Sequence, residues 1–146
     1  MAPGVSYISK NVWIMKKVYI SGRISDLPRE QYMVYFQKVE ELLKDDGFSV
    51  VNPTKFWFSR WYGKLERIVG GETAYRVTLL YDLLRLMKCD LIYKLPGWQQ
   101  SRGANIESCV AYHMKVWPVS KKIVSRMDKA IEKMIIRDES KPKTKK

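Results

Sequence analysis

Short apolar runs alternate with longer amphipathic segments along most of the chain. Four of the short runs predict strands, because each is rich in apolar side chains and most end in turn-forming residues. These runs are residues 18–20, 48–51, 91–95 and 116–119. In the longer segments, apolar side chains recur at helical spacing or a serine stands ready to cap a first turn, and both features predict helices. These segments are residues 30–45, 73–88, about 101–114, and 125–136.

Strands that alternate with helices predict an α/β protein whose parallel sheet carries helices on both faces. We therefore expect a single-domain flavodoxin- or Rossmann-like three-layer sandwich. Its parallel sheet would have four strands, or five if the N-terminus supplies another. Residues 1–16 are expected to be peripheral, 17–137 to form the domain, and 138–146 to be a disordered basic tail.

Residues 54–71 have the least regular pattern, with five aromatic side chains among several basic ones. They predict either a short helix or a lid over a pocket. The aromatic rings suit stacking on nucleobases, but they suit core packing beneath solvated charges equally well. The sequence leaves both pairs of alternatives open.

Composition narrows the class of protein. At 146 residues and 46% hydrophobic content, the chain should fold as one domain with a real core. No apolar run approaches the roughly 20 residues of a membrane helix, and no signal-peptide pattern is evident, so we expect a cytoplasmic protein away from membranes. Cys89 and Cys109 lack metal-site spacing and the chain has one histidine. We expect both thiols to be reduced core residues, and no metal or organic cofactor.

The charge is high and uneven. The formal net charge is +12, and residues 121–146 hold ten lysines and arginines against four acidic residues. Such a chain attracts phosphates, nucleotides and nucleic acids alike, and charge does not choose among them. One function left open is therefore nucleic-acid binding through the basic tail.

The most informative stretch runs from Asp90 to Glu107. An apolar strand ends there at a Pro-Gly turn, Ser101 can cap the next helix, and Gly103 leaves its first turn bare for a ligand. A carboxylate beyond the carboxyl end of a strand lies where open α/β sheets bind ligands. From spacing alone, Glu107 is either a nucleophile or a solvated helix residue.

Other candidates each have a structural alternative. Ser21-Gly22-Arg23, after the first strand, is either a tight turn or a phosphate cradle with a bidentate arginine. It does not form the glycine-rich fingerprint of dinucleotide-binding folds. Asp82 falls within an apolar helical pattern, so it needs a partner or a ligand. Tyr19, inside the first strand, would ordinarily be a core residue whose hydroxyl reaches an edge.

Three motifs together carry a family resemblance: YISGRI at 19–24, VVNP at 50–53, and LPGW, SRGA and a glutamate within 95–107. Their combination resembles the nucleoside 2-deoxyribosyltransferase superfamily, including its 2′-deoxynucleoside 5′-phosphate N-hydrolase branch. The likeness is closest to small members of the DUF4406 type and covers about residues 17–120.

The resemblance implies roles for named residues. Glu107 corresponds to the nucleophile, Asp82 to the acid that handles the departing base, and Tyr19 to the tyrosine beside the nucleophile. Ser101 stands where transferases usually have an aspartate. A serine there resembles the hydrolase branch, where it helps bind a 5′-phosphate.

The first loop departs from the family pattern, because Arg23 replaces a common proline and the hydrolase order Ser-Ile-Arg is reversed as Arg23-Ile24-Ser25. The sequence leaves this phosphate contact undecided. The full set of residues expected to bind phosphate or substrate is Ser21, Gly22, Arg23, Ser25, Asn52, Trp98, Ser101 and Gly103.

The expected function is cleavage of an N-glycosidic bond, or deoxyribosyl transfer, on nucleoside 5′-monophosphates. A carboxylate can stabilise or capture the oxocarbenium character that develops at the sugar. Burial would raise the pKa of Asp82 and keep it protonated for the base. The alternatives are a non-catalytic protein that binds a nucleotide derivative, and the nucleic-acid-binding protein above.

The chain is expected to form a homodimer or a larger homo-oligomer. An apolar stripe on the last helix either pairs with a second copy or packs on its own sheet. The stripe comprises Val124, Met127, Ile131, Met134 and Ile135. The family resemblance also implies pockets completed by a neighbouring subunit.

Overall fold

The computed structural model describes residues 5–8, 12–22, 28–55 and 57–141. Four parallel strands form the main sheet in the order β4-β3-β5-β6. The strands are β3 (Lys17–Ser21), β4 (Ser49–Val51), β5 (Leu91–Lys94) and β6 (Trp117–Pro118). The α/β class and the four-stranded alternative are confirmed.

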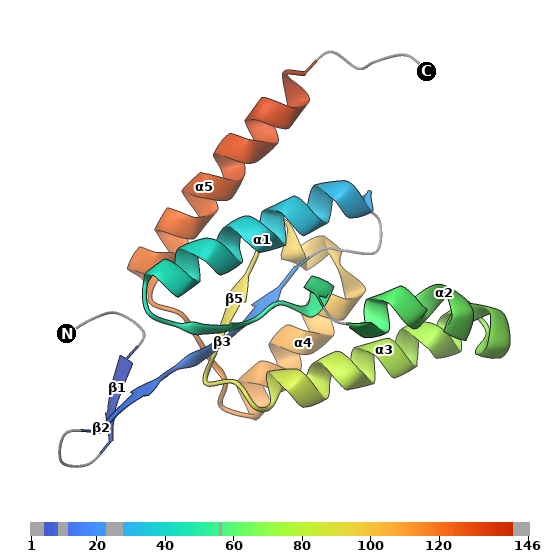
Figure 1. The fold of residues 1–146 in the computed structure, drawn as a ribbon, viewed down its shortest axis with the longest axis horizontal. Coiled ribbons are helices and arrows are strands. Elements are labelled where there is room, and N and C mark those ends of the chain that lie inside the picture. The colour runs from blue at the N-terminus through green and yellow to red at the C-terminus, as the bar shows by residue number, and fades with distance from the viewer. Residues whose placement is uncertain (1–4, 9–11, 23–27, 56, 142–146) are drawn as a thin grey trace.

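Helices cover both faces of this sheet, giving the expected three-layer sandwich (Figure 1). They are α1 (Arg29–Asp45), α2 (Trp57–Val69), α3 (Gly71–Leu86), α4 (Arg102–His113) and α5 (Lys121–Glu139). The short 3-10 helices η1 (Pro53–Lys55) and η2 (Trp98–Gln100) follow β4 and β5. No helix in the described ranges has the length and apolar character to cross a membrane.

Side chains of β3 divide between the two faces, because successive residues of a strand point in opposite directions. Val18 and Ile20 join a large apolar cluster with α1 and α5. Tyr19 packs in a smaller cluster with residues of α3, α4 and β5. Ser21 shares the strand face of Tyr19 and is also buried. The face toward α3 and α4 is therefore the one that carries polar groups.

The chain changes direction across the sheet at β3. It runs from β3 through α1 to β4 on one side, then crosses to β5 on the other side of β3. The carboxyl ends of β3 and β5 therefore flank a topological switch point. In open α/β sheets, ligands bind in the crevice at such a point.

The N-terminal segment forms a separate two-stranded sheet of β1 (Val5–Ile8) and β2 (Val12–Met15). These strands pair with each other in antiparallel register, from Val5 opposite Met15 to Ile8 opposite Val12. The short connection favours a hairpin, since a parallel strand would need a crossover of a dozen or more residues. The possible fifth strand of the main sheet is therefore absent from the described residues.

Of the two alternatives for the irregular segment, the structure shows the helix: residues 57–69 form α2, which packs beside α3. The last helix begins at Lys121 rather than at Ser125, because the Ser120 hydroxyl accepts a hydrogen bond from the amide of Ile123 (3.5 Å) and caps it. Cys89 is a buried free thiol as expected.

The expectation for Cys109 is wrong, because this free thiol is exposed. Cys109 lies two residues after Glu107 on α4, and therefore about 200° around the helix from it. Since Glu107 faces inward, Cys109 faces solvent.

Candidate active site

Two carboxyl groups and two hydroxyl groups meet on the α3–α4 face of the sheet, at the carboxyl half of β3. Tyr19 and Ser21 come from β3, Glu107 from α4 and Asp82 from α3. Asp82 lies close enough to Glu107 to raise its pKa, and the hydroxyls of Tyr19 and Ser21 lie close enough to lower it. The structure thus brings together four residues that come from three separate elements and span 88 positions of the sequence, from Tyr19 to Glu107.

The start of α4 determines how Glu107 is aimed. Ser101 lies at the N-cap, where its hydroxyl accepts a hydrogen bond from the Ala104 amide (3.2 Å). Ala104, Glu107 and Ala111 follow at spacings of three and four residues and form the buried face of the helix. The small alanines let α4 lie close to the sheet, so the longer carboxylate side chain reaches β3. Glu107 is 8% exposed.

Several polar atoms at the centre of this site are left unpaired. The Tyr19 hydroxyl, the Ser21 hydroxyl and Oε2 of Glu107 are buried and have no well-formed hydrogen bond to any described residue. Tyr19 and Ser21 thus influence the charge of Glu107 without meeting hydrogen-bond geometry. Burying such groups unpaired costs free energy, so they are rare in native structures. Their clustering here is typical of a site that binds a ligand.

The carboxyl groups hold protons far more tightly than isolated ones. Burial, and then repulsion by Asp82, raise the pKa of Glu107 to about 8. Burial raises the pKa of Asp82 to about 7, against the opposing effect of the Arg85 guanidinium. The pKa of Tyr19 is raised well above its ordinary value by burial and by both carboxyl groups. Near neutral pH, the pair is therefore suited to holding one proton between its two members.

A second polar group lies at the N-terminus of α4. A Cβ atom on Gly103 would come within 3.2 Å of the Tyr75 hydroxyl, so glycine lets that hydroxyl approach the helix start. The Tyr75 hydroxyl is buried and unpaired among the described residues. The Arg102 guanidinium covers the Tyr75 ring at 4.9 Å and pairs with Glu72 at 3.0 Å. These contacts hold α3 against the start of α4.

The remaining expected residues lie in other surroundings. A Cβ on Gly22 would lie 2.7 Å from Cδ1 of Leu95, so the close approach of this segment to the Leu95 side chain requires glycine there. Trp98 lies on η2 with the Lys94 ammonium 4.2 Å from its ring centre. Arg23 and Ser25 lie outside the described residues.

Asn52 is held by protein groups rather than left open. Its amide donates to Glu40 (3.1 Å), and its carbonyl oxygen accepts from the amide (3.0 Å) and hydroxyl (2.6 Å) of Thr54. Burial raises the pKa of Glu40, but its bonds to Lys55 (2.7 Å), Lys44 (3.0 Å) and Asn52 bring it below the ordinary value. This network fixes the loop after β4.

Sequence reasoning missed Tyr75 and Lys94 at this end of the sheet, and Arg85, whose charge acts on Asp82 from the last turn of α3. Tyr75 precedes Asp82 by seven residues, which is two helical turns, so the spacing could have placed both on one face of α3. Lys94 ends β5, bonds to the Ser108 hydroxyl (3.1 Å), and has a pKa lowered by burial. Only the fold shows that it lies beside Trp98.

No three His, Cys, Asp or Glu side chains gather as a metal site within the described ranges. The chemistry the arrangement can perform is acid–base and nucleophilic: one carboxylate and one protonated carboxyl group, flanked by hydroxyls, next to a bare helix start.

Comparisons with known proteins identify the family of the chain and assign no function to it. No curated protein and no solved structure shows a significant match to the chain. Residues 16–119, which span β3 to β6 and every element of the site, match the model of one family. The chain belongs to that family, which is described as a domain of unknown function, DUF4406.

Proposed function

We propose that this protein cleaves or transfers the N-glycosidic bond of a nucleoside 5′-monophosphate, with Glu107 as the nucleophile. The observation that carries the proposal is the pair formed by the buried Glu107 and the half-buried Asp82, both with raised pKa values, at the switch point of the sheet. A glycosidic bond needs one ionised and one protonated carboxyl group on opposite sides of the departing bond. A coupled pair that shares one proton meets that need near neutral pH once the proton lies on Asp82. The free pair holds it mainly on Glu107, whose pKa is the higher, so the proposal requires the bound substrate to move it to Asp82.

In the proposed reaction, the Glu107 carboxylate attacks the anomeric carbon as the bond to the base breaks. Asp82 gives its proton to the base nitrogen that receives the bonding electrons, so a neutral base leaves. Water, or the hydroxyl of an acceptor, then attacks the anomeric carbon of the glycosyl ester while the Asp82 carboxylate takes its proton. This step releases Glu107 as a carboxylate and restores the proton of Asp82. The nearby hydroxyls of Tyr19 and Ser21 can donate to Glu107 and orient its carboxylate.

The start of α4 supports the choice of a phosphorylated substrate. Free amides and the helix dipole favour an anion at such a terminus. Gly103 leaves room there, and Ser101 adds a hydroxyl without the negative charge of an aspartate. Arg23, which lies outside the described residues, is the proposed second contact.

The proposal includes self-association, through a surface other than the one first considered. The apolar stripe of α5 packs in its own core, where Met127 and Ile131 are buried against the α1 layer. By contrast, α3 exposes Val77, Leu80 and Leu84, with Met87 just beyond its end, as a row spaced three, four and three residues apart. This spacing is that of a coiled-coil seam, so two copies related by a two-fold axis can cover one another's row.

Light scattering tests whether the exposed apolar row of α3 forms a dimer interface. We expect a dimer mass at 50 µM (about 1 mg/ml), and a monomer mass for the double variant Leu80→Lys, Leu84→Lys. Val34→Lys alters an exposed apolar residue on α1 and should leave the dimer intact. A monomeric wild-type protein would reject self-association and leave the catalytic proposal untouched.

A panel of purine and pyrimidine nucleotides and deoxynucleotides tests the function. We expect free base to appear with at least one member, and mass spectrometry of a quenched reaction to find a glycosyl adduct on Glu107. Binding of a nucleotide without release of base would favour the non-catalytic alternative. Release of base with no adduct, and with full activity in Glu107→Gln, would remove Glu107 from the mechanism.

A further inference from the structure

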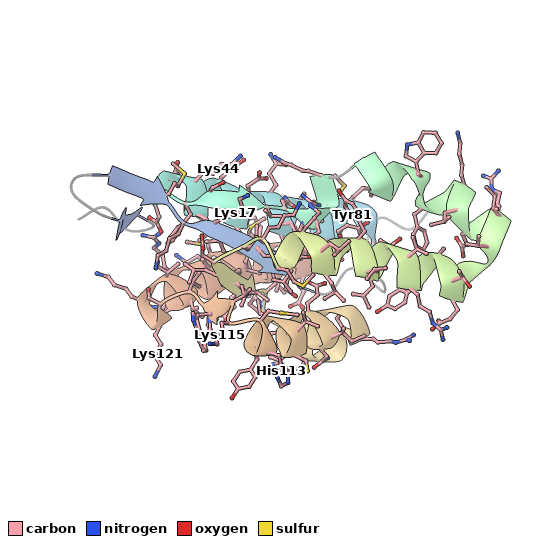
Figure 2. The ribbon with its side chains drawn as sticks, turned by 90° about the horizontal axis from the view of Figure 1, so that it is seen from below. Lys17, Lys44, Tyr81, His113, Lys115 and Lys121 are labelled. Carbon is pink, nitrogen blue, oxygen red and sulfur yellow. The ribbon has the colours of Figure 1, made fainter. Side chains whose placement is uncertain are left out.

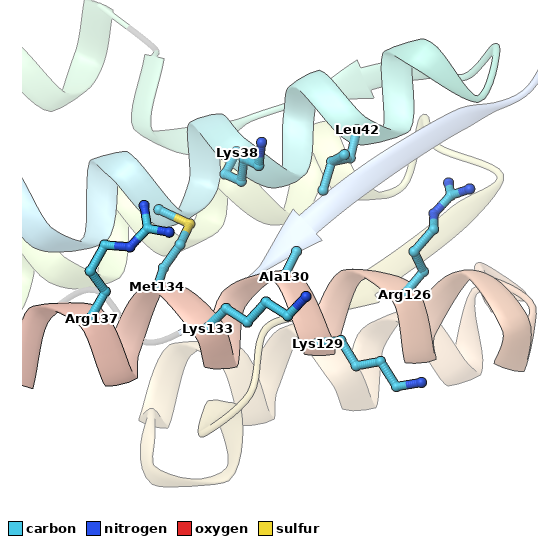
Figure 3. Close-up of a pocket in the computed structure, with 8 residues that line it drawn as sticks. All are labelled: Lys38, Leu42, Arg126, Lys129, Ala130, Lys133, Met134 and Arg137. Atoms are coloured by element: carbon cyan, nitrogen blue, oxygen red, sulfur yellow. The ribbon is translucent and has the colours of Figure 1, made fainter.

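A groove of about 480 Å³ lies between α1 and α5, across the sheet from the candidate active site (Figure 3). Leu42, Ala130 and Met134 contribute its apolar surface, and five basic side chains stand around it. The basic residues are Lys38, Arg126, Lys129, Lys133 and Arg137. The proposed catalytic function uses none of these residues.

The basic residues of α5 form a row rather than a cluster. Arg126, Lys129, Lys133 and Arg137 follow one another at steps of three, four and four residues, which places them on one side of the helix. Eleven residues of helix rise about 16 Å, so adjacent charges lie about 5–6 Å apart along the axis. A single compact anion would be held by charges that converge. A row of this length suits a polymer whose charge repeats.

Most of these cations are not neutralised by the protein. Arg126 pairs with Asp46. Lys38, Lys129, Lys133 and Arg137 form no ion pair with any residue of the described ranges.

Two of the four acidic residues of α5 are turned to other partners. Asp128 accepts a hydrogen bond from the Tyr93 hydroxyl (2.6 Å), and Asp138 accepts one from the Tyr35 hydroxyl (3.1 Å). The residues that line the groove include the basic side chains of α5 and none of its acidic ones.

We propose that this groove binds a single-stranded nucleic acid, with its phosphates along the basic row of α5 and its sugars and bases toward the apolar floor. A basic groove that follows the backbone is one of two usual features of sequence-independent single-strand binding. The other is stacking of bases on aromatic rings, which the residues lining this groove do not supply, so the proposed contact is mainly with the phosphates. A groove between two helices accepts one strand, whereas a duplex has two phosphate backbones and needs a broader surface. The sequence pI of about 9.7 is also that of nucleic-acid-binding domains.

Fluorescence anisotropy with a labelled 20-nucleotide single strand of mixed sequence tests the site in the full chain. The groove variant is Lys129→Gln, Lys133→Gln, Arg137→Gln. A matched control removes the same charge elsewhere: Lys88→Gln, Lys115→Gln, Lys121→Gln. All three control lysines are exposed, and Lys115 and Lys121 project from the edge of the molecule (Figure 2). Circular dichroism checks that both variants are folded.

We expect the groove variant to lose roughly 10- to 100-fold in affinity at 50 mM salt. Its plot of log affinity against log salt should be shallower by about 2, since three phosphate contacts on a single strand each contribute about 0.7. The control should stay within about threefold of wild type. Base-release activity, where present, should be the same in both variants, because the groove lies on the other face of the sheet.

Other results would overturn the inference. Equal losses in the groove variant and the control would mean that overall charge, rather than the groove, attracts the strand. A duplex of the same length that binds as tightly would remove the single-strand assignment, and a poly-glutamate peptide of equal charge that competes as well would remove the nucleic-acid assignment. A wild-type protein that binds no oligonucleotide below 100 µM would also remove the nucleic-acid assignment.

Discussion

The two helical layers, built on the same four strands, are organised in opposite ways. On the α1–α5 side, the inward residues are almost all apolar, and Tyr35 and Tyr93 satisfy their hydroxyls through Asp138 and Asp128. On the α3–α4 side, a smaller apolar cluster borders Glu107 and the Tyr19 and Ser21 hydroxyls, which are buried and unpaired among the described residues. One layer contributes stability. The other retains uncompensated polar groups, which is the pattern of a site where stability is given up for function.

The largest expected effect comes from the polar layer. Glu107→Gln keeps the shape of the side chain but removes its nucleophilic charge, so we expect a loss of about 10³-fold or more in base release. Glu132→Gln, on the exposed surface of α5, provides a matched control and should retain wild-type rates. Circular dichroism should be unchanged in both. Comparable activity in the two variants would contradict the assignment of catalysis to the α3–α4 layer.

The apolar layer should respond in stability instead. Phe36 is fully buried on α1, and its replacement by alanine should lower the free energy of unfolding by about 3–5 kcal/mol, measured by urea denaturation. Val34→Ala, two residues away and 51% exposed, should cost less than about 0.5 kcal/mol. A Phe36→Ala protein as stable as wild type would mean that this layer is not the tightly packed core described here.

The polar layer should also make stability depend on pH in an unusual direction. The folded pKa values of Glu107 and Asp82, about 8 and 7, lie above those of an unfolded chain, so between pH 5 and pH 8 the folded state binds more protons. Stability contributed by this pair is therefore present at pH 5 and lost as the pH rises toward 8, by several kcal/mol for the two groups together. We expect Glu107→Gln to flatten this decline in urea titrations at successive pH values. A wild-type decline that the substitution does not alter would remove the pair as its cause.

The contrast also explains how much of the molecule can be predicted from its sequence. Strands and helices follow from apolar runs and periodicity, and the sheet follows from their alternation, so the class of fold was predictable. The two-residue period of β3 even places Tyr19 and Ser21 on one face. That this face is the one toward Glu107 depends on the crossover from β4 to β5, which no local pattern reveals.

Helix α3 shows why the surroundings of the site residues were harder to predict from the sequence than the class of fold. It has apolar residues on two faces, one with Leu79, Leu83 and Leu86, and the other with Val77, Leu80 and Leu84. Both faces have apolar residues at helical spacing, yet Leu80 and Leu84 are 59% and 48% exposed while Leu86 is fully buried. Asp82 belongs to the inward face. Asn52 likewise looked like a ligand contact, but its partner Glu40 lies 12 residues away on α1, where no motif marks it.

The smallest effects compare two serines that cap helices. Ser101 caps α4 beside the polar site and Ser120 caps α5 in the other layer. Replacing either with alanine should lower the free energy of unfolding by about 1 kcal/mol, because each removes a cap hydrogen bond. Stability alone therefore cannot distinguish the two.

Substrate preference should distinguish them. If the start of α4 binds the 5′-phosphate, Ser101→Ala should lose roughly tenfold in kcat/KM for a deoxynucleotide and change little for the dephosphorylated nucleoside, since a hydrogen bond to a charged group contributes about 1.5 kcal/mol or more. Ser120→Ala should leave the ratio of the two substrates at its wild-type value. An unchanged ratio in both variants would limit Ser101 to capping its helix, because a cap that only stabilises α4 has no reason to favour the phosphorylated substrate.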